Sequence, residues 1–262
     1  MASSAIFRSR SIMQACAFLL GAVLLLAPVS ARADYHVRSP DEIDEGEIEI
    51  EHNGAAIVDT DRQRNGARAY TAEVGYGVNS WWHPELELGM SREPGPGQHT
   101  KVDSVVWENT VSFTEPGEYW ADLGFYGEYG LATLDKSADG VLWGPLVQKD
   151  IGRTTHTLNV LFANEIGPNK DAHGTDLKYA WQSRWNISQY ASPALEIYGD
   201  AGQIDRMPGF DQQQLLAGPV MLGSISVGSV GRLKYELGAL GGITEASPSA
   251  AVRWRIEIER RF

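Results

Sequence analysis

The sequence predicts an all-β fold, an up-and-down antiparallel meander of about twelve strands. Three observations predict it. Apolar and polar residues alternate through segment after segment, with the two-residue period of a β-strand. The connections between these segments are alternately long and short, as in a meander whose loops gather at one end. No apolar run after residue 33 is long enough for a transmembrane helix, and amphipathic helical patterns are scarce.

The strand patterns are bounded by turn residues rich in glycine, proline, aspartate and asparagine. In chain order, we expect strands near residues 46–58, 68–79, 81–92, 101–114, 117–130, 139–149, 153–167, 176–188, 193–202, 212–227, 230–243 and 248–262.

One face of nearly every expected strand is charged. The early stretches "GEIEIEH" and "PELELGM" alternate glutamate with isoleucine or leucine. In 117–130, one side carries Tyr119, Ala121, Leu123, Phe125 and Tyr129, and the other carries Glu118, Asp122 and Glu128. Tyr179, Trp181 and Trp185 oppose Lys178, Gln182 and Arg184 in 176–188, and Leu233, Tyr235 and Leu237 oppose Arg232, Lys234 and Glu236 in 230–243. Alternation alone also fits a soluble sandwich whose charged face meets water.

The connections favour a meander. The stretches "DTDRQRNGA", "REPGPGQHTK", "LATLDKSADG", "GPNKDAHGTD" and "DAGQIDRMPGFD" are long, and "VNSW", "TEPGE", "DIGR", "QYASP" and "VGSVG" fall between them and are short. An even number of strands then places both ends of the meander on the short-turn side. The similar segments "WGPLV" and "AGPVM" contain proline within an apolar pattern, so we expect a bulge or the start of a strand at each.

The beginning of the chain is typical of a secretory signal peptide. Arg8 and Arg10 precede an apolar stretch that reaches Pro28, and small residues follow at Ala31 and Ala33. Cleavage after Ala33 removes three arginines and no acid, so the formal charge changes from -12 to -15. The mature chain is then without cysteine and strongly acidic, which argues against nucleic-acid partners.

The last predicted strand points to a family of architectures. In "SAAVRWRIEIERRF", apolar residues alternate with charged ones and the final residue is Phe262. With the signal peptide and the alternating loops, this resembles a Gram-negative outer-membrane β-barrel. The resemblance implies a transmembrane barrel over 46–262, in the outer membrane and in contact with its lipid, after a signal peptide (1–33) and an acidic periplasmic lead-in (34–45). It also implies a signal for the barrel-assembly machinery, to which Trp254, Ile256, Ile258 and Phe262 correspond. Arg260 departs from that pattern.

In such a barrel the apolar faces meet lipid and the charged faces meet the lumen. Carboxylates dominate the early strands and cations are more frequent in the later ones, and closure brings the last strand beside the first. A salt-bridged seam is the simplest interpretation of this pattern. The candidates for lumen charge and selectivity are Glu47, Glu49, Glu51, Glu73, Glu85, Glu87, Glu108, Glu118, Asp122, Glu128, Lys178, Arg184, Arg232, Lys234, Arg253 and Arg255.

Three functions are compatible with these features. The first is a narrow, porin-like channel or transporter for small polar or cationic solutes. The second is a structural or surface barrel whose long loops bind a partner. The third and weakest is a membrane-embedded hydrolase, for which His156 on one expected strand and Ser183 on the next could meet as base and nucleophile. We expect no enzyme activity.

The sequence offers no cofactor motif, no serine elbow and no phosphate loop. The six histidines are scattered without the spacing of metal ligands, so we predict no metal site. The acidic lead-in, with Asp41, Glu42, Asp44 and Glu45, is expected to be solvated.

Overall fold

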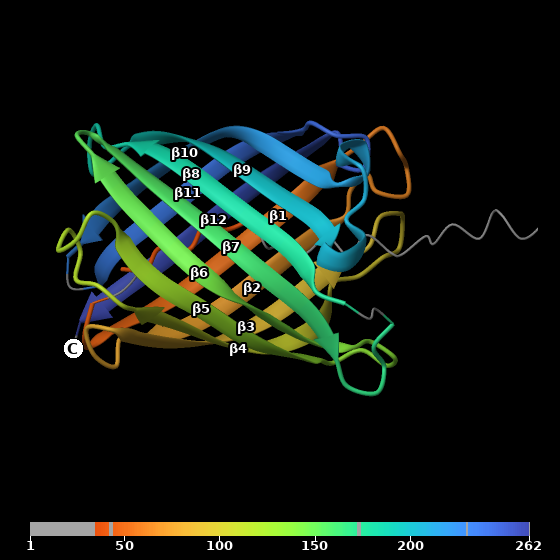
Figure 1. Ribbon diagram of the computed structural model, residues 1–262, viewed down its shortest axis with the longest axis horizontal. Helices are drawn as coiled ribbons and strands as arrows, with labels where there is room; N and C mark the ends of the chain where they lie inside the picture. The colour runs from red at the N-terminus through yellow and green to blue at the C-terminus, as the bar shows by residue number, and fades with distance from the viewer. Residues whose placement is uncertain (1–34, 42–43, 172–173, 229, 262) are drawn as a thin grey trace, which may run out of the picture. The chain divides into compact units, whose positions relative to one another are not determined.

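The structure is a computed structural model that describes residues 35–41, 44–171, 174–228 and 230–261. The expected signal peptide and Phe262 lie outside these residues. Within them, twelve antiparallel strands form a closed barrel, which confirms the predicted fold class (Figure 1). The strands are β1 (Glu47–Val58), β2 (Arg68–Tyr76), β3 (Trp82–Arg92), β4 (Lys101–Ser112), β5 (Asp122–Ala132), β6 (Asp139–Ile151), β7 (Thr154–Ile166), β8 (Asp176–Trp185), β9 (Ser192–Gln203), β10 (Gln214–Val227), β11 (Gly231–Gly242) and β12 (Ala250–Arg261).

Each strand pairs with the next one in the chain, and β12 closes the ladder on β1. The closing register runs from Glu47 opposite Arg261 to Val58 opposite Ala250, so the whole length of β1 is paired. Closure removes the two unpaired edges that an open sheet would expose. No helix in the described part of the chain is long and apolar enough to cross a membrane.

The two ends of the barrel differ, as the sequence predicts. We call them the turn end and the loop end (Figure 1, left and right). The turn end holds the connections 77–81, 113–121, 152–153 and 186–191, together with the described residues 228 and 230. The loop end holds 59–67, 93–100, 133–138, 167–171, 174–175, 204–213 and 243–249, with two 3-10 turns, η1 (Ile204–Arg206) and η2 (Phe210–Gln212), in 204–213. The first residue of β1 and the last of β12 pair at the turn end.

The alternation places polar side chains inside the barrel and apolar side chains outside. In β1, Glu49 and Glu51 point inward and are 0% and 2% exposed, whereas Ile50 between them points outward and is 60% exposed. Leu86 and Leu88 on β3 are exposed in the same way. A soluble protein would bury such an apolar band and expose the acids. The outer surface is therefore suited to an apolar surrounding.

One candidate lumen residue was placed wrongly by the sequence pattern. Glu118 lies exposed in the 113–121 turn, because β5 begins at Asp122 and not near residue 117. The Asp122 carboxylate accepts a hydrogen bond of 2.6 Å from the backbone N–H of Gly117, whose φ of 75° suits glycine. The Leu123 N–H donates to Thr114 Oγ1 at 2.9 Å. These bonds hold 114–121 as a turn outside the ladder.

The loops that flank the closing strands are joined across the seam. The carboxylate of Asp59 lies 3.1 Å from Arg64 Nε and accepts hydrogen bonds from the backbone N–H groups of Asp61 and Ser249. Burial raises the pKa of Asp59, but these hydrogen bonds and the Arg64 charge outweigh burial and hold its pKa below the usual range. Arg64 also donates to the carbonyl oxygen of Ala246 at 3.2 Å. The first and last loops therefore support the closure of the barrel at the loop end.

The two glycine-proline pairs lie inside strands, not at strand starts. The β6–β7 register passes over Gly144 and Pro145, and the β10–β11 register passes over Gly218 and Pro219. Proline cannot donate to a ladder, and the neighbouring strand comes close at this point. A Cβ atom on Gly144 would lie 2.0 Å from the carbonyl oxygen of Val160. Glycine is thus required for the backbones to approach at this interruption.

We expect Gly144→Ala to destabilise the barrel by about 1 to 3 kcal/mol, because the added methyl group must push β6 away from β7. The matched control is Gly140→Ala on the same strand, where the nearest atom would lie 3.9 Å from the new Cβ. The measurement is the urea midpoint of unfolding in detergent micelles, followed by tryptophan fluorescence. Equal midpoints for the two variants would contradict the assignment.

Candidate functional site

The candidate site is the lumen, whose wall receives charged side chains from most strands. Except for Glu118, the predicted lumen residues all occupy the inward-facing positions of their strands. The set of lumen candidates omitted further inward acids, among them Glu196, Glu236, Glu257 and Glu259, although the alternation of the last two strands places Glu236, Glu257 and Glu259 on their charged faces. It also omitted Tyr126 and Tyr198, which are 0% and 5% exposed.

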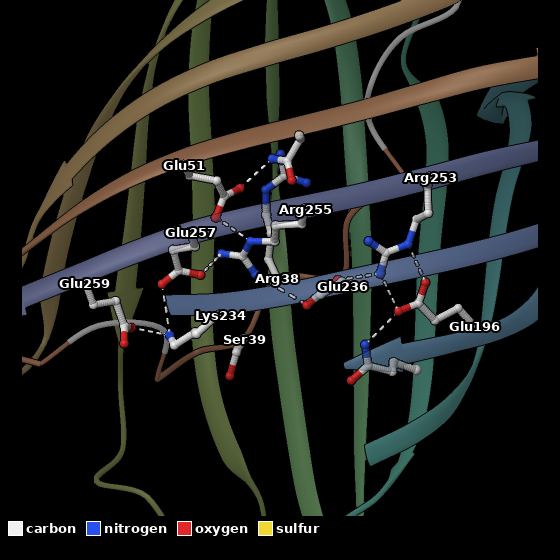
Figure 2. A network of polar contacts seen from close by, with 12 residues as sticks. Arg38, Ser39, Glu51, Glu196, Lys234, Glu236, Arg253, Arg255, Glu257 and Glu259 are labelled. Atoms are coloured by element: carbon white, nitrogen blue, oxygen red, sulfur yellow. Dashed lines mark hydrogen bonds and ion pairs between the residues drawn. The ribbon is translucent and has the colours of Figure 1, made fainter. Parts of the chain in front are cut away.

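Charges on β9, β11, β12 and β1 form one connected set, which we call the arginine network (Figure 2). Its members are Glu51, Glu196, Lys234, Glu236, Arg253, Arg255, Glu257 and Glu259.

Arg255 links the last strand to the first. Its Nε donates to Glu51 on β1, its Nη2 lies 3.1 Å from Glu257, and its Nη1 lies 3.7 Å from Glu236. Glu51 also accepts a hydrogen bond from Asn53. Arg255 therefore forms the salt-bridged seam that closure predicts.

Arg253 contacts other acids than the β1 glutamates. Its guanidinium donates two hydrogen bonds to Glu196 on β9, from Nε to Oε2 at 2.8 Å and from Nη2 to Oε1 at 2.6 Å. The same guanidinium also forms an ion pair with Glu236. Glu196 accepts two more hydrogen bonds of 2.7 Å, from Gln182 and from the hydroxyl of Tyr198. Such two-point geometry and full pairing are what a buried charge requires.

Lys234 completes the network toward the turn end. Its ammonium lies 3.0 Å from Glu257 and binds Glu259, and Glu259 is also 3.7 Å from Arg232. A cavity of about 470 Å³ opens here, lined by Arg184, Arg232, Lys234, Glu236, Arg255 and Glu257 among others. The turn end of the lumen on this side is thus a charged vestibule.

The opposite wall is acidic. Glu73 on β2 lies directly across from Glu87 on β3, and Glu108 on β4 lies directly across from Glu128 on β5. Carboxylate oxygens of Glu73, Glu87 and Glu108 lie within 4.8 Å of one another. We call these four residues the acidic group. Like charges directly opposite one another are destabilising, so this wall needs a cation or protons to compensate it.

A guanidinium from outside the strands lies against the acidic group. We call residues Tyr35–Asp41 the inner segment, and the barrel wall holds it through hydrogen bonds. Its residues Val37, Arg38 and Pro40 are buried, which differs from the solvated lead-in that the sequence suggested, whereas Asp41, Asp44 and Glu45 are exposed as expected. The guanidinium of Arg38 lies 3.7 Å from Glu108 and 3.9 Å from Glu128 and is centred 4.1 Å from the ring of Tyr126. The hydroxyl of Tyr126 bridges both carboxylates.

The inner segment is held by the wall along its length. The backbone N–H of Arg38 donates to Asn159 Oδ1 at 2.8 Å, and Asn159 Nδ2 donates back to the Arg38 carbonyl at 2.7 Å. This side chain on β7 thereby replaces the partner strand that the segment lacks. Toward the turn end, Gln148 on β6 bonds Ser39 and Asp41, each at 2.9 Å. Toward the loop end, the ring of Tyr35 packs edge-on against Tyr198 at 5.4 Å.

The inner segment crosses the lumen because of its composition. Asn159 and Gln148 satisfy its backbone and polar groups, and the acidic group attracts its single arginine. Val37 joins an apolar cluster at the loop end with Ile57, Leu216 and Leu240. No strand-like alternation marks this stretch, which is why the sequence pattern did not reveal its position.

The fold of the chain is similar to those of several proteins of known structure. No family model and no curated protein matches the sequence. An outer membrane channel from Pseudomonas putida F1 is similar in structure, with a TM-score of 0.61 at 13% identity, over 87% of this chain and 98% of that one. The fold is that of an outer-membrane barrel.

Other barrels align less well. The translocator domain of the autotransporter NalP from Neisseria meningitidis has a TM-score of 0.49 at 16% identity, over 85% of this chain and 90% of that one. A bacterial polysaccharide outer membrane secretin has a TM-score of 0.46 at 10% identity, over 84% of this chain and 100% of that one.

The remaining described residues that the sequence pointed to lie on the outward faces of their strands. Trp254, Ile256 and Ile258 occupy outward positions of β12, and Trp254 packs against Tyr70 with ring centroids 6.0 Å apart. His156 and Ser183, the weak hydrolase candidates, are directly opposite in the β7–β8 register, but on the outward face. There His156 stacks on Trp181 and its Nε2 lies 3.0 Å from Thr154 Oγ1.

Three groups of inward side chains have the spacing of possible metal ligands in the described residues: Glu49 with His83 and Glu85, Glu49 with Glu257 and Glu259, and the three glutamates of the acidic wall. Carboxylate oxygens with a buried histidine could hold a divalent cation. In the first group, His83 Nε2 lies 3.6 Å from Glu49 Oε1 and His83 Nδ1 lies 3.9 Å from Glu85 Oε2, so a protonated His83 would pair with both carboxylates.

We expect Arg253→Met to destabilise the barrel by about 3 to 5 kcal/mol, because it leaves the buried carboxylate of Glu196 without its cation. The control is Arg206→Met in η1, where the arginine side chain is 68% exposed and an effect near zero is expected. Unfolding in urea, with band-shift on unboiled gels as a second readout, measures both. A shift for Arg253→Met no larger than the control's would show that the network carries little stability.

Proposed function

We propose that the protein is an outer-membrane channel for small polar or cationic solutes, with the lumen as its path. The observation that carries the proposal is the pairing of an apolar outer surface with a lumen lined by ionisable side chains. Such a wall attracts polar solutes and repels apolar ones through its field. The similarity in fold to an outer membrane channel supports the proposal that the chain forms a membrane-spanning barrel.

The location and assembly follow from the same proposal. A closed barrel pairs the backbones of its strands with one another and leaves no open edge, so its outward apolar band can face lipid. We propose that the chain is exported with its first 33 residues as a cleaved signal, inserted by the barrel-assembly machinery and surrounded by outer-membrane lipid. A band that shifts on boiling, in the outer-membrane fraction, is the result expected of this location.

The inner segment is proposed to limit the current. It occupies lumen space that solutes would use, and it places Arg38 where a cation would otherwise lie. The acidic group, on the wall formed by β2 to β5, is proposed to make the channel selective for cations. Its like-charge pairs favour any positive group that enters.

Deletion of residues 34–41 from the mature chain is expected to raise single-channel conductance severalfold in planar bilayers, because the lumen loses its inner segment. Heat-modifiability of the variant checks that the barrel has formed. The comparison is Arg206→Met, which leaves the lumen unchanged and should conduct as the parent does. A folded deletion variant with unchanged conductance would contradict the limiting role.

Glu73→Gln combined with Glu87→Gln is expected to move the reversal potential in a KCl gradient toward that of chloride, since the acidic wall loses two carboxylates. Glu118→Gln, in the exposed 113–121 turn, is the matched control and should leave it unchanged. Identical potentials for both variants would remove the acidic group from the selectivity mechanism.

A further inference from the structure

The wall residues that contact the Arg38 side chain, Glu108, Tyr126 and Glu128, have features of a ligand site. The cations of the arginine network belong to strands and are paired with acids that also belong to strands. Arg38, in contrast, reaches the wall from the inner segment, which pairs with no strand. The wall around it is complete without Arg38, because Glu108, Tyr126 and Glu128 belong to β4 and β5.

The geometry of this wall suits a planar cation. The ring of Tyr126 offers its face at 4.1 Å, and two carboxylates lie at 3.7 and 3.9 Å from the guanidinium. A guanidinium is planar, weakly hydrated and forked, so it gains both from an aromatic face and from carboxylates. An alkali ion keeps its water more strongly and has no fork to match.

The local charge also favours a cation. The Arg38 guanidinium lies 3.7 Å from Glu108 and 3.9 Å from Glu128, which carry two of the four carboxyl groups of the acidic group, and the four lie opposite one another in pairs across the ladder. If the Arg38 side chain leaves, another positively charged group can take its place beside these carboxylates and compensate their charge. The ladder fixes the backbone of β4 and β5, and the Tyr126 hydroxyl bonds both Glu108 and Glu128, so these three side chains are held independently of Arg38.

We propose that the pocket formed by Glu108, Tyr126 and Glu128 is a binding site for small solutes that carry a guanidinium group, and that Arg38 is its tethered occupant. The side chain of Arg38 and the free solute then compete for one site. This inference rests on the proposed channel function for its role in transport, where it names the class of solute. As a binding site it stands on the geometry alone.

The variant Arg38→Ala empties the pocket and keeps the backbone hydrogen bonds to Asn159. The probe is methylguanidinium chloride, and its neutral control of the same shape is methylurea. In planar bilayers, methylguanidinium is expected to block the Arg38→Ala current at a concentration roughly tenfold lower than it blocks the parent. Methylurea is expected to have no such difference.

A second measurement separates the site from the channel. Methylguanidinium, and not methylurea, is expected to raise the unfolding temperature of Arg38→Ala in detergent, and the parent is expected to respond much less. If Arg38→Ala does not fold, as unboiled gels would show, Arg38→Gln is used in its place. A variant that folds and is stabilised but carries no current would overturn the channel and keep the site.

Two outcomes would overturn the site itself. The first is an equal response of the Arg38 variant to methylguanidinium and methylurea. The second is an undiminished response when Glu108→Gln is added to Arg38→Ala, since the pocket then lacks one of its two carboxylates.

Discussion

Closure of the ladder between β1 and β12 is the constraint on which the rest of the structure depends. It gives every strand a hydrogen-bonded neighbour on both sides. It also divides the side chains into an outward face, which must be compatible with an apolar surrounding, and an inward face, which must pair its charges. Inward side chains must be compensated by one another, because the barrel interior admits little water around residues such as Glu49 and Glu51. Closure also brings Arg255 to Glu51 across 204 residues of sequence. The seam is therefore both a backbone and an electrostatic joint.

The lumen solves its charge problem in two ways. On the side of β9 to β12, the cations and the acids both belong to strands and pair directly, as Arg253 on β12 does with Glu196 on β9. On the side of β2 to β5, the strands supply mainly acids, and the compensating guanidinium comes from the inner segment. The first solution is fixed by the ladder. The second depends on a segment outside it, which is why that side is the place where a solute can compete.

Sequence reasoning reached the strand number and order, and it located strand boundaries to within a few residues except at β5. That failure has a local cause, because the alternation from Tyr119 to Tyr129 looks continuous while hydrogen bonds to Asp122 hold 114–121 as a turn. Glu118 was therefore assigned to the lumen and lies outside it. Arg38 was missed for a different reason. Its contacts with β4, β5 and β7 are 70 to 121 positions away in sequence, and no periodic pattern encodes them.

By itself, the sequence determined the alternation of inward and outward residues and the two kinds of connection, because both are properties of adjacent residues and of turn chemistry. It thereby determined a meander with one charged face and one apolar face, and the resemblance to outer-membrane barrels supplied the closure and the charged interior. Only the tertiary structure decided which charges meet. The registers of the strands and the closure of the barrel bring Arg253 to Glu196 and Arg255 to Glu51. Residues 35–41 are bound to the inner wall, as by the hydrogen bond between Asn159 and Arg38. These pairings depend on distances across the barrel, which no local pattern of residues can specify.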